Sequence, residues 1–290
     1  MPAQTPRRAP AVRAASVGPG MDEKICIFED VYNDVSARAQ AEHEKAGAFG
    51  MLARMKLWDR PKETDIALAN TEKRYEPFWM AKASRRTRYT RRTSYHVKIE
   101  HPHVTAVELL GQKLVIDARR ELQLAAVEDC DNVTALTHFV DALRHDTPEK
   151  TLIDYAGRFA FAELADSSQP QFIAPTLTAA SVLQQVKSRL SAPIEADAIA
   201  SDEVDIESLT LFYRPVYAFQ FAWRDKTGVI EIDGLSGRVN KEGDMLGGAV
   251  RKLGNRDALF DLGADFAGMV VPGGTIVVKL IDKLSKKHPA

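Results

Sequence analysis

Two short stretches of this chain resemble one another, and each opens an aromatic-rich run with the alternation of a β-strand. Tyr75-Glu76-Pro77-Phe78-Trp79 begins one run, and Tyr213-Arg214-Pro215-Val216-Tyr217 begins the other. Proline has no backbone N–H, so within a sheet it is confined to strand starts, edges and bulges. The shared pattern predicts a duplicated unit, in which residues 75–116 and 213–239 superpose as antiparallel sheet with the two prolines at equivalent positions.

Composition is that of a soluble globular protein with room for two modest cores. The chain has 290 residues, of which 45% are hydrophobic and 27% charged. No run approaches the roughly 20 apolar residues that a transmembrane helix needs, so no membrane span is expected. Two cysteines, Cys26 and Cys130, are too few for a disulfide framework, which favours a reducing, cytoplasmic location. Residues 1–20 carry arginines without a following apolar segment and are predicted to be a disordered tail.

The predicted fold class is α+β, with two related helix-plus-antiparallel-sheet units joined by helices and followed by a helical C-terminal tail. In the first unit, Phe78–Tyr89 and Thr93–Ile99 are predicted to pair as a hairpin, and a second hairpin turns at Gly111-Gln112. The predicted helices are 31–57, 131–145, 151–164, 178–190, 256–266 and 275–287. The predicted organisation is a tail (1–20), a first unit (21–120), a helical connector (121–172), a second unit (173–240) and a Gly-punctuated helical tail (241–290).

The second unit carries a resemblance to a known family. Its helix, its Tyr-x-Pro strand and the run from Trp223 to Val239, with turns at Asp233-Gly234 and Ser236-Gly237, resemble a PepSY-type domain between Thr178 and Val239. The resemblance implies a small binding or regulatory module without catalytic residues of its own. It is often extracytoplasmic in that family, whereas this chain shows no export signal in its first twenty residues.

Common catalytic motifs are absent from the sequence. It contains no phosphate-binding loop, no dinucleotide-binding glycine motif, no HExxH, no paired CxxC and no GxSxG. His138, Asp141 and His145 would lie on one face of a helix, which raises a metal hypothesis. An apolar face opposite them favours a solvent-exposed trio instead. The sequence therefore predicts no catalytic residues, no metal and no cofactor, and a metal-dependent enzyme is the third-ranked function.

The strongest pattern is a concentration of basic residues with interleaved aromatics. Between Pro77 and Ile99 there are seven arginines and lysines and no acidic residue. The candidate binding residues in this basic hairpin are Lys82, Arg85, Arg86, Arg88, Tyr89, Arg91 and Arg92. Arginines can form bidentate contacts with phosphates and tyrosines can stack on bases, so this pattern is typical of nucleic-acid binding.

A second pattern offers an alternative partner for these arginines. No basic residue occurs between Arg189 and Arg214, and the acidic residues there are Glu195, Asp197, Asp202, Glu203, Asp205 and Glu207. An acidic strand facing the basic hairpin, within one chain or between subunits, would satisfy both without nucleic acid. An arginine-rich edge strand that prevents unwanted sheet pairing is the remaining interpretation.

The leading functional prediction is a non-enzymatic binding or scaffold module that acts through protein contacts, with a protein partner or as a homo-oligomer. A nucleic-acid-binding protein that uses residues 85–92 is the alternative.

Overall fold

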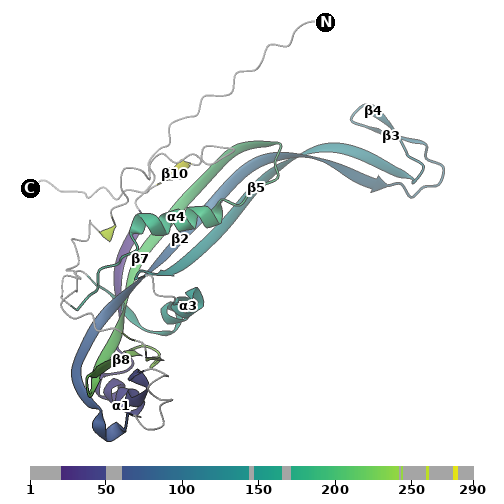
Figure 1. Cartoon of the computed structure of the whole chain (residues 1–290). Helices are drawn as coiled ribbons and strands as arrows, with labels where there is room; N and C mark the ends of the chain where they lie inside the picture. Colours follow the sequence, from purple (N-terminus) through teal and green to yellow (C-terminus); the bar gives the residue numbers. More distant parts are fainter. Residues whose placement is uncertain are drawn as a thin grey trace, which may run out of the picture.

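Two very long antiparallel strands organise the protein. The computed structural model describes residues 21–49, 61–143, 147–164, 171–241, 243, 259–260 and 277–279. In this part of the chain, β2 (Ala67–Lys98) and β7 (Ala198–Trp223) run side by side in an eight-stranded sheet whose main path has the order β5-β2-β7-β1-β6 (Figure 1). The other strands of this sheet are β1 (Asp22–Phe28), β5 (Glu121–Asp141), β6 (Phe161–Glu163), β8 (Lys226–Asp233), β9 (Val239–Asn240) and β10 (Val277–Lys279).

Three α-helices are found among the described residues, and two begin with a side-chain cap. They are α1 (Asp34–Glu44), α3 (Glu149–Arg158) and α4 (Ala179–Leu190), with short 3-10 helices at Lys45–Phe49 and Glu63–Asp65. Asn33 accepts a hydrogen bond from the Ser36 N–H at the start of α1, and Thr178 does the same for Ser181 at the start of α4. The helix predicted at 178–190 is thereby confirmed.

The predicted fold class is wrong. The two Tyr-x-Pro strands are neighbours within one sheet, so the described residues do not form two helix-plus-sheet units. Residues 121–141, placed in a helical connector, form strand β5. In the predicted C-terminal helix, Val277–Lys279 is strand β10, and the rest of that helix lies outside the described residues. The predicted helix at 256–266 and the tail at 1–20 fall almost entirely outside them as well.

The resemblance between the two Tyr-x-Pro stretches has a structural explanation. Tyr75 pairs with Pro215 and Pro77 pairs with Tyr213, so the two motifs face each other antiparallel across β2 and β7. A local twofold axis therefore passes between Glu76 and Arg214, which are direct cross-strand partners. Both stretches are strands, as predicted, but their likeness reflects this crossing rather than two separate units.

Each proline lies where its strand changes its outer neighbour. The Pro77 carbonyl accepts from the Ala142 N–H at the end of β5, and two residues earlier Tyr75 pairs with the segment 171–173. On β7 the Pro215 carbonyl accepts from the Gly234 N–H at the end of β8, and the edge beyond is taken by β1. A missing N–H is tolerated at such a change of neighbour, which accounts for proline within these long strands.

The sheet carries a helix on each face, because alternate residues of a strand point to opposite sides. On one face Val182, Leu183 and Val186 of α4 pack against a cluster that includes Trp79 and Leu211. On the other face α3 covers a cluster of stacked rings formed by Phe28, Phe78 and Phe212. The two helices hold the central part of β2 and β7 between them.

A third core lies at the far end of the long strands. Ala37 and Ala41 of α1 pack against Phe219 and Phe221 of β7 and against the neighbouring hairpin strand β8. The small alanines let the helix approach the aromatic strand closely. The tight turn predicted at Asp233-Gly234 is present at the other end of β8, next to Pro215. A Cβ at Gly234 would come within 3 Å of Pro215, which explains why glycine occupies this position.

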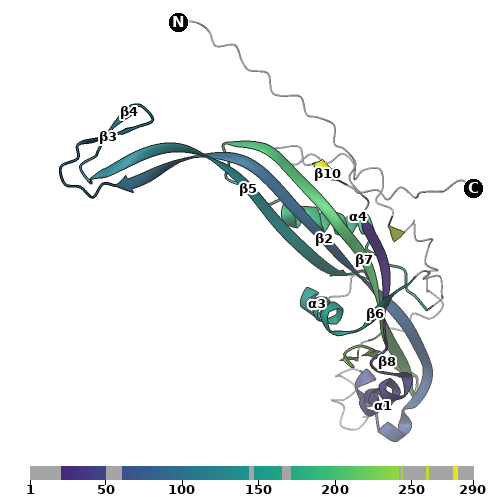
Figure 2. The ribbon, with the colours of Figure 1, turned by 180° about the vertical axis from the view of Figure 1, so that it is seen from behind.

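The opposite end of the sheet extends into a two-stranded arm. Beyond Thr90, β2 pairs only with β5 among the described residues, and both strands continue away from the helices (Figure 2). We call residues 91–128 the arm. Its tip carries the small hairpin of β3 (Ala106–Leu109) and β4 (Gln112–Val115), which confirms the predicted hairpin. The turn is at Leu110-Gly111, one residue before the predicted Gly111-Gln112.

Candidate functional site

The predicted basic hairpin is a single strand. Residues 85–92 lie within β2 without a turn, so successive side chains point to opposite faces of the sheet. Arg85 is buried on the α4 face, whereas Arg86, Arg88, Arg91 and Arg92 are exposed. Lys82 is also exposed and Tyr89 is partly buried. The predicted set is thus not one continuous basic surface.

Arg85 is the most extensively bonded member of the set. Its guanidinium donates to both carboxylate oxygens of Asp202, at 2.8 and 2.9 Å, and to the carbonyls of Leu190 and Ala192, both at 2.7 Å. The last two carbonyls lie at the C-terminal end of α4, where helix carbonyls lack internal partners. The hydrogen bonds from Arg85 and from Thr87 lower the pKa of Asp202. Arg85 therefore joins β2, β7 and α4 and is not available to a ligand.

The exposed arginines of β2 are paired with acids of the neighbouring strands. Arg86 binds Asp131 of β5 in a bidentate manner, and Arg88 approaches the same carboxylate at 3.5 Å. Arg91 donates to Glu128 of β5, and Arg92 lies 3.3 Å from Asp197. The hydrogen bond that each guanidinium donates to its carboxylate partner raises the pKa of Arg86 and that of Arg91.

The predicted acidic residues fall in three kinds of position. Asp202 is buried against Arg85, and Asp197 precedes β7 and contacts Arg92. Glu203 and Asp205 lie across from Arg86 and Ser84 of β2. Glu195 and Glu207 are exposed. The idea that an acidic strand faces the basic residues within one chain thus describes part of the contacts observed.

Sequence reasoning missed the acids of β5. Glu128 and Asp131 are direct partners of Arg91 and Arg88 in the β2–β5 ladder. Their signal was the β-branched, alternating run from Leu122 to Phe139, in which these acids recur among Val, Thr and Ala. Interpreting 131–145 as a helix concealed it.

His138 and Asp141 are not solvent-facing, contrary to prediction. They lie at the end of strand β5 with 2% and 7% exposure, and His145 lies outside the described residues. His138 Nδ1 is 2.8 Å from Glu149 of α3, and its Nε2 is 3.0 Å from Gln185 of α4. Asp141 accepts from the Leu143 N–H and the Thr147 hydroxyl. No cluster of three or more metal-ligating side chains occurs within the part of the chain that the structure describes.

Glu149 holds this junction of β5, α3 and α4 together. Its carboxylate accepts from the Phe139 N–H at 2.9 Å, contacts His138 and pairs with Arg189 of α4 at 3.0 Å. Burial alone would raise the pKa of Glu149, but the Phe139 N–H, His138 and Arg189 outweigh it and lower the pKa to about 2.

A lowered pKa gives this carboxylate a stabilising effect that depends on pH. The contribution is complete above the ordinary pKa near 4.5 and is lost as the pH falls through about 2. We expect Glu149→Gln to lower the thermal midpoint at pH 7 and to differ progressively less from the wild type as the pH approaches 2. Asp154→Asn, at an exposed position of the same helix, is the control. The difference between its thermal midpoint and that of the wild type should be the same at each pH. If the difference in thermal midpoint between Glu149→Gln and the wild type stays constant with pH, the stabilising role given to the Glu149 carboxylate is contradicted.

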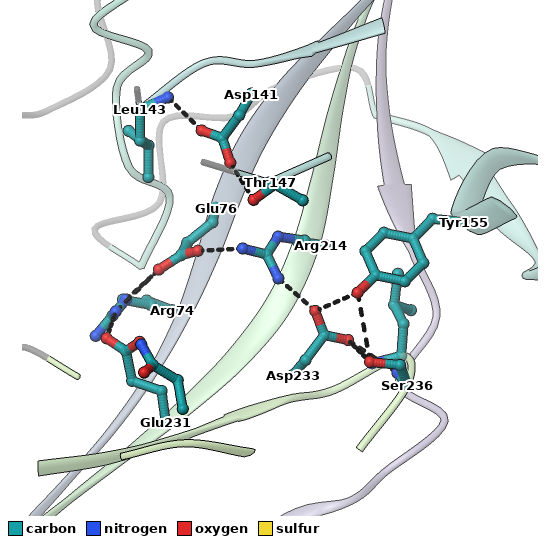
Figure 3. Close-up of polar contacts among 12 residues, drawn as sticks. Arg74, Glu76, Asp141, Leu143, Thr147, Tyr155, Arg214, Glu231, Asp233 and Ser236 are labelled. Carbon is teal, nitrogen blue, oxygen red and sulfur yellow. Dashed lines mark hydrogen bonds and ion pairs between the residues drawn. The ribbon is translucent and has the colours of Figure 1, made fainter. Parts of the chain in front are cut away.

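A buried network of alternating charges crosses the sheet where the two Tyr-x-Pro strands meet (Figure 3). Arg214 binds Glu76 at 2.8 Å and also binds Asp233, and Arg74 bonds to Glu76 at 2.9 Å and to Glu231. Burial would lower the pKa of Arg214, but the charges of Glu76 and Asp233 outweigh it and raise the pKa above its ordinary value. The arginines thus remain charged inside the sheet.

Asp233 also closes the turn after β8. One of its oxygens accepts from the N–H groups of Leu235 and Ser236, and the other accepts from the Tyr155 hydroxyl at 3.0 Å (Figure 3). Its oxygens are therefore engaged by backbone, hydroxyl and guanidinium donors. An arrangement this fully bonded fixes the strand crossing and the position of α3, and it presents no free nucleophile or base for chemistry.

The arm collects exposed apolar side chains. Half of the large apolar side chains that are exposed among the described residues belong to it: Tyr95, Val97, Leu109, Leu110, Val115 and Val127. The faces of β2 and β5 that α3 and α4 cover continue into the arm, where none of the helices in the described residues covers them (Figure 1). Exposed apolar residues gathered in one element are typical of an interaction surface.

The turn at the arm tip has an unusual residue. Leu110 has φ of 51° and Gly111 has φ of 75°, the positive values of a two-residue type I′ hairpin turn. Asparagine or glycine is the usual first residue, because a bulky side chain is strained in this conformation. Leu110 is also 97% exposed. The tip therefore combines backbone strain with a fully exposed apolar side chain.

Leu110→Asn is expected to stabilise the tip hairpin by about 1 kcal/mol, because asparagine adopts positive φ at lower cost. The amide protons of Leu109 and Gln112, which flank the turn, should exchange about fivefold more slowly. Residue-resolved hydrogen exchange would detect this, with Glu108→Gln on the same hairpin as a control. Faster exchange in Leu110→Asn would show that the turn conformation is misassigned.

Comparison with protein-family models, curated proteins and solved structures finds no match for this chain. The PepSY resemblance therefore stays a prediction. Across the described residues, no helix has the length and apolarity required to cross a bilayer.

Proposed function

We propose that this protein is a non-enzymatic binding or scaffold module whose contact element is the arm of residues 91–128. A long ribbon free of helices offers two faces and an edge to a partner, while the helix-covered part of the sheet holds it in place. The observation that carries the proposal is the concentration of exposed apolar side chains on this ribbon, from Tyr95 to Val127.

The charge of the arm fits a protein partner better than a phosphate backbone. Its basic and acidic residues nearly balance: Arg91, Arg92, Lys98, Lys113, Arg119 and Arg120 against Glu100, Glu108, Asp117, Glu121 and Glu128. Interfaces between proteins bury apolar cores with paired polar rims, whereas nucleic-acid binding relies on a surplus of cations. The exposed arginines of β2 already have carboxylate partners, which weighs against the nucleic-acid alternative.

A reducing, cytoplasmic location is part of this proposal. Its support is that Cys26 and Cys130 are free thiols and that Cys26 is buried in the core.

Removal of the arm tests the proposal. Residues 92–127 would be replaced by Asn-Gly, so that the paired Arg91 and Glu128 flank a two-residue type I′ turn. We expect this variant to keep the thermal midpoint of the full chain and to lose its self-association in light scattering. Identical association of both proteins, or salt-sensitive binding of duplex DNA or RNA by the full chain, would contradict a protein-binding arm.

A further inference from the structure

The outer edge of β5 has a long row of backbone groups without partners in the described part of the chain. The N–H of Phe139 points away from β2 and is taken by Glu149, and the carbonyl of Glu121 points the same way and is taken by Asp117. The β2–β5 register is unbroken. The backbone N–H and carbonyl groups of the odd-numbered residues of β5 therefore point outward, away from β2. Between these two capped ends, eight residues from Gln123 to Thr137 present unpaired N–H and carbonyl groups.

Apart from its three acids, Glu128, Asp129 and Asp131, this edge lacks the features that normally prevent strand pairing. From Leu122 to Thr137 it contains no lysine, arginine, proline or glycine. The β2–β5 ladder also has no bulge, whereas the β2–β7 ladder shifts register at three places. The side chains of Val127 and Val133, two residues whose backbone groups point outward, are 64% and 61% exposed. A long, regular edge with these properties is a template for an added strand.

We propose that the edge of β5 pairs antiparallel with β5 of a second copy of this chain, about a twofold axis at Val127. The inference rests on the proposed function and names both its partner and its surface. The two-stranded arms of the two copies would become one continuous four-stranded ribbon. Isologous pairing of this kind closes at two subunits.

The charges of β5 select this register. A twofold axis at any residue from 128 to 131 would place an acid opposite itself or opposite another acid, because Glu128, Asp129 and Asp131 are clustered there. An axis at Val127 places Asp129 opposite Ala125 and Asp131 opposite Gln123, whose amide can donate to it. Leu124 then meets Cys130 on the other face.

Helix packing disfavours a twofold axis on the C-terminal side of these acids, at Val133. A twofold axis at Val133 would require pairing as far as Thr137. This pairing would reach Leu136, where β5 begins to pack against the α4 cluster. Two residues further along, His138 contacts both α3 and α4. An axis at Val127 uses residues 123–131, none of which belongs to the helix-packed core clusters.

Cysteine cross-linking tests the register in the full chain. At the axis the two Val127 Cα atoms would be about 5.5 Å apart, within disulfide range. In a Cys130→Ser background, Val127→Cys should form a disulfide-linked dimer on mild oxidation. The matched control is Val133→Cys, equally exposed on the same edge, whose two copies would be about 40 Å apart. Cross-linking of Val133→Cys with equal or greater yield would overturn the register, and so would failure of Val127→Cys to cross-link.

Lysine substitutions separate this inference from the function on which it rests. Val127→Lys would place two like charges opposite one another and should raise the dimer dissociation constant about tenfold or more. Val133→Lys would face Glu121 and should leave dimerisation unchanged or stronger. If truncating the arm abolishes association but both lysine variants associate normally, the edge pairing is wrong while the arm remains the binding element. If truncation itself has no effect, the proposed function fails as well.

Discussion

Replacing Arg214 by methionine is expected to destabilise the protein by about 3–5 kcal/mol, the usual cost of removing one partner from a buried ion network. Methionine fills similar volume but leaves Glu76, which is 3% exposed, and Asp233, which is 6% exposed, without their shared cation. Urea denaturation monitored by tryptophan fluorescence would measure the loss, since Trp79 and Trp223 are buried in two of the cores.

The exposed pair of Arg91 and Glu128 supplies the control. Arg91→Met removes an arginine from a surface ion pair and should leave the denaturation midpoint nearly unchanged, because exposed pairs contribute little. A similar midpoint for Arg214→Met and the wild type would mean that the network at the strand crossing does not carry the stability assigned to it.

Arg85→Met is expected to cost about 3–5 kcal/mol as well, because it removes a bidentate partner from Asp202 and two donors from the end of α4. The next residue gives an internal comparison. Arg86 follows Arg85 directly, but it points to the opposite, exposed face and binds Asp131 in solvent, so Arg86→Met should barely change the thermal midpoint.

Comparing these two adjacent arginines distinguishes a strand whose arginines stabilise the fold from a strand whose arginines bind a ligand. A phosphate-binding run would tolerate loss of either arginine in folding assays, since both would serve the ligand. Equal and small effects of Arg85→Met and Arg86→Met on stability would contradict the structural role given to Arg85.

Local features of the fold were predictable from sequence. Thr178 is a good N-cap before the apolar positions of α4, and Gly111 marks the tip hairpin, so both elements were found. The alternating aromatic residues after Tyr213 gave strand β7 over much of its length. These signals lie within a few residues of the structure they specify.

The long-range pairing was not predictable in the same way. The likeness of the Tyr-x-Pro stretches predicts a duplication, yet the two strands pair within one sheet with Glu76 opposite Arg214. No glycine or proline interrupts residues 89–93, which are continuous strand although a turn was expected there. Residues 131–141 have helical spacing of polar groups, but their Val and Thr content and pairing with β2 make them a strand.

The candidate site depended on the same long-range information. Alternation along β2 was enough to divide Arg85 from Arg86, but the identity of their partners required the register of β5 and β7. Much of the charge pattern that pointed to a nucleic-acid ligand is satisfied within the sheet. The ribbon beyond Thr90, which no described helix covers, is the surface that we propose for a partner.

The most direct measurement is residue-resolved amide hydrogen exchange of the full chain at low and high protein concentration. Outward-facing amides of Gln123, Ala125 and Val127 should exchange rapidly in dilute protein and slowly in concentrated protein, whereas Leu124 and Ala126, which face β2, should be protected at both. This result would identify the arm as the contact element. Rapid exchange of the outward amides at both concentrations, with new protection on α1 or β8 instead, would contradict it.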